Sequence, residues 1–448
     1  MHQKRGRRRL TSISTTATVG KSRTTSQRIC TMDLFFREKY LKRIRGFYHS
    51  GDLIKVITGV RRCGKSSLMQ MIAHELSMQG IPADRIIFLN LDLRKYRKIK
   101  TADQLEELLT EQLQDDGLNY VFIDEVQNVD GFEEVLNGFR EEGKCSIFIT
   151  GSNSYLLSGE LATKLTGRTI EFEIYTLTFD EYVQMKAFYH KDIHPNTAVE
   201  LQKYILEGGF PRCVLIEDMQ DKRHYAEGIA KEIFEKDIRR RVKIRNRESL
   251  ESIRQYLVNN FGATTSINNL YQDLRKNGQS ISRQALTHYI NVLLDAKVLY
   301  ECGRFDLKSR KSLSGEKKYY IADLSFYYAL NTDNRINFGP VLENIVFFYA
   351  KSLGSSVSVG RIGQLECDFI LRNKAMDYAY VQVAYTIAAS RETEDREYCP
   401  LEKIKDNYPK FVLTTDAILQ QRNGIHHVNL MDFMINGHGF EEIYTHSG

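Results

Sequence analysis

Residues 59–66 (GVRRCGKS) have the types and the spacing that are suited to binding a triphosphate. They match the pattern G-x-x-x-x-G-K-S and stand between a β-branched run, 54–58, and a helical pattern of apolar residues. In such a loop the two glycines let the backbone turn, so that successive N–H groups point at phosphate oxygens. The start of the following helix adds a partial positive charge. We therefore predict a phosphate-binding loop here.

Two side chains of this loop would carry its chemistry. Lys65 would reach the β- and γ-phosphates, and the Ser66 hydroxyl would be a ligand of Mg²⁺. With the strand before it and the helix after it, the pattern predicts a nucleotide site. The residues expected to line it are Gly59, Val60, Arg61, Arg62, Cys63, Gly64, Lys65, Ser66 and Ser67.

A second apolar run, YVFIDEVQ, ends in two adjacent acids, Asp124 and Glu125. Burying two carboxylates at the end of a strand is costly unless they meet a cation or polarise water. We predict that Asp124 holds Mg²⁺ and that Glu125 orients or deprotonates the attacking water. The alternative is a strand that simply runs into an acidic loop, and it is the weaker interpretation beside this phosphate-binding loop.

Further polar residues follow the next strands. The run CSIFIT is followed by a small polar cluster that contains Ser152 and Asn153, and one of these two is expected between the two strands already described, near the γ-phosphate or the attacking water. Arg168 follows Gly167 and precedes an alternating strand. It could act as a finger on the nucleotide of a neighbouring subunit, although a surface arginine is an equally good interpretation. Arg212 is a second candidate for sensing the nucleotide.

The combination of ITGVRRCGKSS, FIDEVQNVDGFEEVLNGFR, FITGSNSYLLSGELATKLTGR, LTFDEY, GGFPR and IFEKDI resembles prokaryotic AAA-type ATP-binding proteins. These proteins join a P-loop domain to a winged-helix-like segment and to a C-terminal domain similar to restriction endonucleases. The resemblance covers nearly everything from Met32 onward. It implies an α/β fold with a parallel P-loop sheet of the ASCE type, Asn153 as a sensor-like residue, and ATP as the ligand.

Residues 201–336 are expected to form a helical lid and a winged-helix-like region. The run IFEKDIRRRVKIRN concentrates basic residues, and three helices and a strand pair are expected after it. In a winged helix the third helix commonly enters the major groove of DNA. Its exposed face offers polar side chains that can contact phosphates or base edges: Ser280, Arg283, Gln284, Thr287 and His288. Binding a protein, or merely connecting two domains, is an equally good interpretation.

Residues 337–448 show the order of a restriction-endonuclease-like fold: a helix with Glu343, three strands, a helix and a strand. In active members, acids on the second and third strands and a lysine on the third hold magnesium and activate water. Glu343 and Asp368 match two acidic positions, but Gln382 and Ala384 replace the next acid and the lysine. A neutral ligand holds a hard cation weakly, and alanine cannot activate a nucleophile. We predict a nuclease-like fold without efficient nuclease chemistry.

The net charge of the 448-residue chain is +6, but its first 32 residues contain eight basic residues and no acid, which leaves −2 for the rest. We expect residues 1–31 to be disordered. They could be a transit peptide, a nucleic-acid-binding arm, or sequence upstream of a start at Met32, and we favour the last. Seven scattered cysteines and the lack of a long apolar run favour a cytoplasmic protein without a membrane partner.

The sequence thus predicts an ATPase domain over residues 32–200, the middle region, and an inactive nuclease-like domain. ATP hydrolysis with Mg²⁺ would control the later regions, which would contact double-stranded DNA, a protein partner or a second copy of the chain. One alternative is a DNA-binding switch that holds ATP and rarely hydrolyses it. Another is a nuclease that uses an unrecognised residue.

Overall fold

The computed structural model describes residues 34–151, 165, 167–239, 246–309, 311–330 and 337–440, without the side chains of 313 and 314. From Leu34 onward the chain forms one compact unit. The leader, Ser152, Asn153 and part of the basic run, 240–245, lie outside the described residues. No helix among the residues described is long and apolar enough to cross a membrane.

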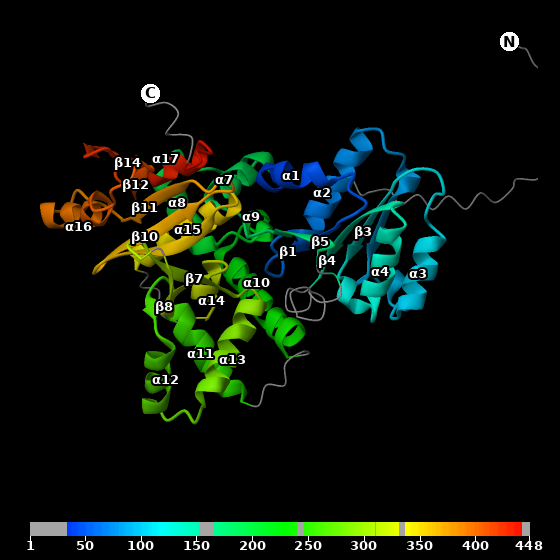
Figure 1. The fold of residues 1–448 in the computed structure, drawn as a ribbon, viewed down its shortest axis with the longest axis horizontal. Helices are drawn as coiled ribbons and strands as arrows, with labels where there is room; N and C mark the ends of the chain where they lie inside the picture. The colour runs from blue at the N-terminus through cyan, green and yellow to red at the C-terminus, as the bar shows by residue number, and fades with distance from the viewer. Residues whose placement is uncertain are drawn as a thin grey trace, which may run out of the picture. The chain divides into compact units, whose positions relative to one another are not determined.

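The first sheet has five strands in the order β2–β3–β4–β1–β5, and every neighbouring pair is parallel (Figure 1). Strand β4 lies between the strand that leads into the phosphate-binding loop and the strand that ends in Asp124, which is the arrangement predicted for an ASCE-type sheet. The predicted α/β class is confirmed. The strands are β1 (Ile54–Thr58), β2 (Ile86–Asn90), β3 (Asn119–Asp124), β4 (Cys145–Thr150) and β5 (Thr169–Glu173).

Both faces of this sheet are buried. On β3, Val121 and Ile123 belong to one hydrophobic cluster while Phe122, between them, belongs to another, because successive side chains of a strand point to opposite faces. The sheet thereby holds its loops on a rigid support. The helices of this part are α1 (Glu38–Ile44), α2 (Lys65–Met78), α3 (Ala102–Thr110) and α4 (Phe132–Glu141), with short 3₁₀ turns η1 (Arg45–Phe47), η2 (Ala83–Arg85), η3 (Arg94–Tyr96) and η4 (Val126–Asn128).

The middle of the chain is mainly helical, and the predicted boundary after residue 200 falls within α8. Helix α12 begins after Ser266, and the Ser282 hydroxyl caps α13 by accepting a hydrogen bond from the Ala285 N–H at 3.1 Å. The helices are α7 (Phe179–Phe188), α8 (Thr197–Glu207), α9 (Pro211–Leu215), α10 (Met219–Glu232), the π-helix η5 (Ile233–Ile238), α11 (Arg247–Asn259), α12 (Ile267–Lys276), α13 (Arg283–Asp295) and α14 (Ser325–Leu330).

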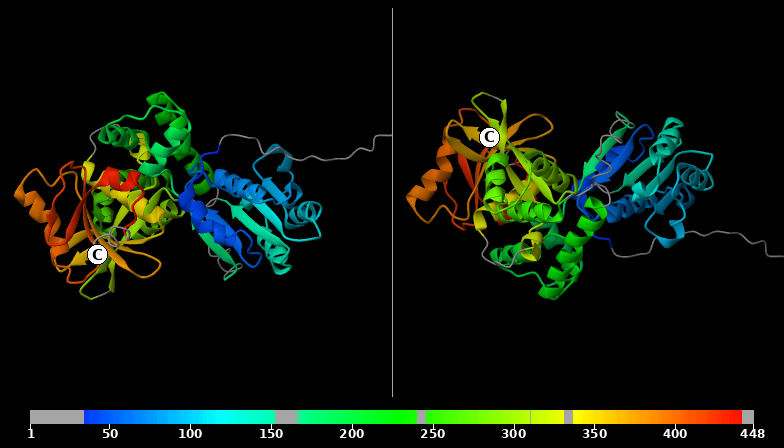
Figure 2. Two further views of the ribbon diagram at one scale, coloured as in Figure 1. Left: turned by 90° about the horizontal axis from the view of Figure 1, so that it is seen from above. Right: turned by 90° about the horizontal axis from the view of Figure 1, so that it is seen from below.

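A second sheet of nine strands runs in the order β13–β14–β12–β11–β10–β9–β7–β8–β6. Figure 2 shows its C-terminal strands, in yellow to red, from two further directions. The parallel pairing of β7 with β9 joins the strand pair of the middle region to the C-terminal strands, so the two predicted regions share one sheet. Its strands are β6 (Thr264–Thr265), β7 (Leu299–Asp306), β8 (Lys311–Ile321), β9 (Ser356–Ile362), β10 (Leu365–Arg372), β11 (Tyr378–Val383), β12 (Lys410–Thr414), β13 (Gln421–Arg422) and β14 (Ile425–Asn429). The remaining helices are α15 (Phe338–Ser352), α16 (Arg391–Glu402) and α17 (Leu430–Ile435).

The buried arginine Arg37, which directly precedes α1, ties three segments together. Its guanidinium forms two hydrogen bonds to the Glu181 carboxylate, at 2.9 and 2.7 Å. It also donates to the backbone oxygens of Cys63, at 3.1 Å, and Tyr175, at 2.8 Å. Cys63 belongs to the phosphate-binding loop and Glu181 to the LTFDEY motif. Arg37 therefore links the phosphate-binding loop to residues 175–181, which follow the last strand of the first sheet.

The two glycines of the GGFPR motif form a second junction. The Gly209 N–H donates to Asp323 Oδ2 at 2.8 Å, and its carbonyl accepts from the Leu177 N–H at 2.7 Å. A Cβ on Gly209 would lie 2.3 Å from the Leu177 oxygen, so only glycine permits this approach. Asp323 follows β8, and the motif therefore connects the end of the first sheet region to the second sheet.

Replacing Arg37→Met should lower the free energy of unfolding by about 3–5 kcal/mol, because the Glu181 carboxylate would stay buried without its cation. Urea unfolding followed by circular dichroism measures this loss. Lys191→Ala is the control: it removes an ion pair to Glu217, which is 87% exposed, and should cost at most about 1 kcal/mol. Equal losses of unfolding free energy in the two variants would show that the buried Arg37–Glu181 pair matters no more for stability than an exposed ion pair.

Candidate functional site

The predicted phosphate-binding loop connects β1 to α2, and three of its residues have positive φ angles. Gly59 has φ 139°, Arg62 68° and Gly64 108°. A Cβ on Gly59 would lie 2.1 Å from the Ile174 oxygen, so this position excludes every larger residue. Arg62 adopts the left-handed conformation without being glycine, which is a strained state typical of ligand-binding loops.

Lys65 begins α2, and its side chain lies back over the loop. Its Nζ donates to the backbone oxygens of Gly59, at 2.9 Å, and Val60, at 3.3 Å. Gly64 at the N-cap offers no side chain to the first N–H groups of α2, and the first turn contains no acidic residue. These N–H groups and the ammonium together form a site for an anion.

The carboxylate of Asp124 lies at the end of β3 and is held from both neighbouring strands. Asn90, the last residue of β2, donates from Nδ2 to its Oδ2 at 3.1 Å. Thr150, the last residue of β4, donates from its hydroxyl to Oδ1. Sequence analysis did not identify Asn90 or Thr150. The signal was available, because polar residues that end neighbouring parallel strands meet at one edge of the sheet.

Glu125 follows directly and has φ 59°, again in the left-handed region. Its N–H donates to the Thr150 hydroxyl at 3.2 Å, and its carboxylate accepts a hydrogen bond from the Gln127 amide. Burial raises the pKa of the Glu125 carboxyl, and the positive charges of Lys65 and Arg61 lower it in part. The predicted base and the predicted phosphate ligand therefore lie within electrostatic reach of each other.

The other predicted residues lie in different surroundings. Arg61 and Arg62 form ion pairs with acids of α10 and η5. Arg168 precedes β5, and its carbonyl accepts from the Ile54 N–H, so it lies at the start of β1 rather than at the loop after it. The first and last residues of β1 are about 13 Å apart, given the rise per residue of a strand. Its role on a neighbouring subunit stays a prediction, as does the sensor role of the exposed Arg212.

A second cluster of charged side chains lies between β8, α15 and β10. Lys318 Nζ is 2.9 Å from Glu343 Oε2, 3.0 Å from Glu366 Oε1 and 3.7 Å from Asp368 Oδ1. The Asp368 N–H donates to Gln382 Oε1 at 3.3 Å. The structure thus brings together the residues that match acidic positions of nuclease-like folds. It adds a lysine from a strand outside the predicted nuclease-like domain, which sequence analysis missed.

The electrostatics of this cluster are those of a buried ion pair with excess negative charge. Burial raises the pKa of Asp368, with a further rise from Glu343, and Lys318 opposes both effects. Burial by itself lowers the pKa of Lys318, but the surrounding carboxylates outweigh it and raise this pKa above its ordinary value. Ala384, in the place of the expected lysine, is buried. Within the described residues, no group of three or more His, Cys, Asp or Glu side chains is arranged as a metal site.

Comparison with known proteins identifies two regions of the chain. A family model described as an AAA domain matches residues 52–183. A domain of unknown function, DUF8612, matches residues 199–336. The AAA match spans the strand, loop and helix of the phosphate-binding segment together with Asp124 and Glu125. The first sheet is therefore that of an AAA-type P-loop protein.

Two relatives match over most of their length. An uncharacterised protein of Haemophilus influenzae is 33% identical over 402 residues, covering 89% of this chain and 98% of the relative. An uncharacterised protein of Methanocaldococcus jannaschii is 31% identical over 402 residues, covering 87% and 84%. Among solved structures, the Walker-type ATPase of Pyrococcus abyssi covers 66% of this chain and 96% of its own, at 17% identity and a TM-score of 0.47.

Gly59→Ala should weaken ATP binding at least about tenfold, because the added methyl group meets the Ile174 oxygen and costs strain of order 1–3 kcal/mol. Titration with a fluorescent ATP analogue measures the change in affinity. Gly138→Ala in α4 is the matched control, since no atom lies within 4 Å of its added Cβ. Unchanged affinity in the Gly59 variant would show that the loop does not hold phosphate in this conformation.

Proposed function

This chain belongs to the same family as the Haemophilus influenzae and Methanocaldococcus jannaschii relatives and carries an AAA domain, and on that basis we propose that it binds and hydrolyses ATP with Mg²⁺. The observation that carries the proposal is the meeting of two predicted motifs at one edge of the first sheet. Lys65 and Asp124 come from segments about sixty residues apart, yet the parallel order of β1, β4 and β3 turns both toward the same edge.

The residues present fit Mg²⁺ and ATP. The first N–H groups of α2 and the Lys65 ammonium would hold the phosphates, and the Ser66 hydroxyl with Asp124 would hold the metal. The donor set supports this assignment, since Asp124 is already oriented by Asn90 and Thr150. Bound Mg²⁺ would supply neutralisation of the charge that develops on the phosphate oxygens.

Glu125 is the proposed general base. Its carboxylate is oriented by the Gln127 amide and its backbone by the Thr150 hydroxyl, so it is fixed rather than free to turn. Burial raises its pKa, which makes the carboxylate a better acceptor for a proton of the attacking water. The positive charges of Lys65 and Arg61 oppose this rise in pKa and favour the ionised carboxylate.

Lys65→Ala should abolish tight ATP binding, and Glu125→Gln should bind ATP normally but hydrolyse it about 10²–10⁴-fold more slowly, as expected when a general base is removed. Hydrolysis by the wild type should rise with pH through the raised pKa of Glu125, because only the carboxylate accepts the proton. Phosphate release and analogue binding, each measured from acid to neutral pH, give these values.

Two results would contradict these assignments. Unchanged ATP affinity in the Lys65 variant would show that the loop does not bind the phosphates. Normal turnover in the Glu125 variant would show that Glu125 is not the general base. Tight binding with almost no turnover in the wild type would favour the alternative of a nucleotide-holding switch. Gly138→Ala again serves as the control for general damage.

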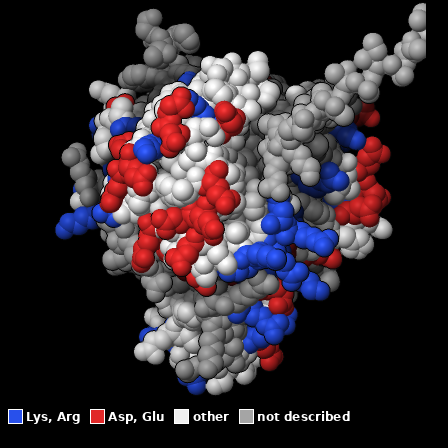
Figure 3. All heavy atoms as spheres, turned by 90° about the vertical axis from the view of Figure 1, so that its right-hand side faces the viewer, with Lys and Arg blue, Asp and Glu red and all other residues white. Residues whose placement is uncertain are grey.

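We propose DNA contact by the middle region as a second function. The observation that favours it is that Ser280, Arg283, Gln284, Thr287 and His288, on α13 and just before it, are all exposed. Arg283 lies over the ring of Tyr271, 5.2 Å from its centroid, which fixes part of this face. On the face drawn in Figure 3, basic and acidic side chains gather in separate groups, so the charge there is local rather than spread over one basic surface.

We further propose that the Lys318 cluster is not a nuclease site. The ammonium of Lys318 already neutralises part of the charge on Glu343 and Glu366, which a divalent cation would otherwise balance. Gln382 adds no charge, and its amide donates to Glu397 at 2.9 Å. The cluster is better suited to holding β8, α15 and β10 together, where breaking a buried pair is costly.

The full-length protein should retard duplex DNA at low salt, and less at physiological salt, and should leave plasmid DNA uncut with Mg²⁺. Arg283→Ala should weaken the retardation, whereas Arg391→Ala, an exposed residue of α16, should not. Gel shift and plasmid nicking assays measure both effects. Equal retardation by the two variants would contradict the role of α13, and cleavage that disappears in Asp368→Ala would establish a nuclease.

A further inference from the structure

Two arginines of the phosphate-binding loop are bound by acids that lie about 170 residues further along the chain. Arg61 forms two hydrogen bonds to the carboxylate of Asp237, at 3.0 and 2.8 Å. It also lies 3.9 Å from Glu232. Arg62 donates to the same Glu232 at 3.3 and 3.2 Å. Asp237 lies in the π-helix η5 and Glu232 at the end of α10, so the loop is joined directly to the middle region.

The Arg61 pair is buried and two-pronged, whereas the Arg62 pair is exposed. The side chains of Arg61 and Asp237 are 12% and 8% exposed, against 53% for Arg62. Burial alone would lower the pKa of Arg61, yet Asp237 and then Glu125 raise it above its ordinary value. The Arg61 guanidinium therefore interacts electrostatically with the proposed base, Glu125, and forms hydrogen bonds with η5.

The π-helical winding of η5 explains how both acids reach the loop. Glu232 and Asp237 are five residues apart, and in an α-helix of 3.6 residues per turn such residues lie about 140° apart around the axis. In a π-helix, residue i bonds to residue i+5, so these two positions share a face. The Arg239 N–H donates to the Phe234 oxygen at 2.8 Å in this i to i+5 pattern. Such helices are rare and frequently mark functional sites.

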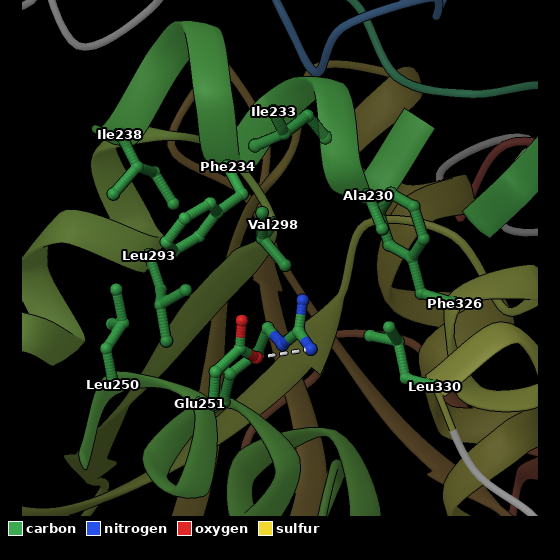
Figure 4. Close-up of a pocket in the computed structure, with 11 residues that line it drawn as sticks. Ala230, Ile233, Phe234, Ile238, Leu250, Glu251, Leu293, Val298, Phe326 and Leu330 are labelled. Atoms are coloured by element: carbon green, nitrogen blue, oxygen red, sulfur yellow. Dashed lines mark ion pairs between the residues drawn. The ribbon is translucent and has the colours of Figure 1, made fainter. Parts of the chain in front are cut away.

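The opposite face of η5 is apolar and lines a small cavity (Figure 4). Phe234 and Ile238 point into it from η5, and Leu250 of α11 and Leu293 of α13 meet them from the other side. The cavity volume is about 20 Å³, which holds roughly one water molecule and is too small for a ligand.

We propose that Asp237 is a positioning residue for Arg61 and that it couples the nucleotide site to α10, η5 and the helices behind them. The proposal rests on the function proposed above. A bound triphosphate brings negative charge to the loop, where it competes with Asp237 for the Arg61 guanidinium. Nucleotide binding therefore loosens the hold of the loop on η5, and phosphate release restores it.

Because coupling between two sites is reciprocal, releasing Arg61 from η5 must also strengthen nucleotide binding. Asp237→Asn keeps the shape of the side chain but removes its charge. It should raise ATP affinity at least about fivefold, the lower end of typical coupling effects. Glu235→Gln is the matched control, since Glu235 lies on the same π-helix but forms its ion pair with the exposed Arg239.

The test combines nucleotide titration with hydrogen exchange of peptides from α10 and η5, in the full-length chain. Both use the Glu125→Gln background, so that ATP stays intact. In that background and in the Glu235→Gln control, ATP should increase exchange in residues 219–239. With Asp237→Asn, exchange should already be high without ATP and change little on its addition. Arg61→Gln should give the same high exchange, because it removes the other half of the pair.

The outcomes separate this inference from the proposed function. If the protein carrying only Glu125→Gln does not bind ATP, the proposed function fails. If it binds ATP but Asp237→Asn changes neither the affinity nor the exchange response, the coupling through Asp237 is wrong while the ATP site stands. A fall in affinity with Asp237→Asn would mean that Asp237 serves only to hold the loop in shape, and would overturn the competition between Asp237 and phosphate.

Discussion

The loop between β1 and α2 is the constraint on which the rest of the structure depends, because its strained backbone must be held in one conformation without help from a regular element. Arg37 holds it from behind through the Cys63 oxygen and is itself fixed by Glu181. Asp237 holds it from the other side through Arg61. Two buried guanidinium–carboxylate pairs thus act on one loop, and each brings in a segment from a different part of the chain.

The same physical device recurs in the second sheet. Lys318 of β8 lies among carboxylates of α15 and β10, where it serves as their internal counter-ion. Buried ion pairs add little net stability, but losing one partner is costly, so they fix which surfaces pack together. In this protein they occur where segments distant in sequence meet. In the regions that follow the AAA domain in the sequence, buried charge pairs therefore determine which segments pack together, in addition to apolar packing.

The two ends of the proposed coupling differ in kind. At the loop the coupling is electrostatic, since phosphate and Asp237 would compete for the Arg61 guanidinium. On the apolar face of η5 the coupling depends on side-chain packing, because Phe234 and Ile238 lie against α11 and α13 with only a small cavity between them. A π-helix suits this position, since its winding can bring two acids to the loop while it keeps an apolar face on the core.

The sequence by itself determined the phosphate-binding loop, the acids Asp124 and Glu125 at the end of β3, and the order of the C-terminal elements, because each depends on residues close together in the chain. It predicted Gln382 and Ala384 as departures from a nuclease-like site, but it did not predict that Lys318 lies among the carboxylates of that cluster. The joining of β7 to β9, the hold of Asn90 and Thr150 on Asp124, and the pairing of Arg61 with Asp237 appeared only in the tertiary structure. Each joins residues far apart in sequence, and local periodicity carries no information about which distant strand or charge will lie alongside.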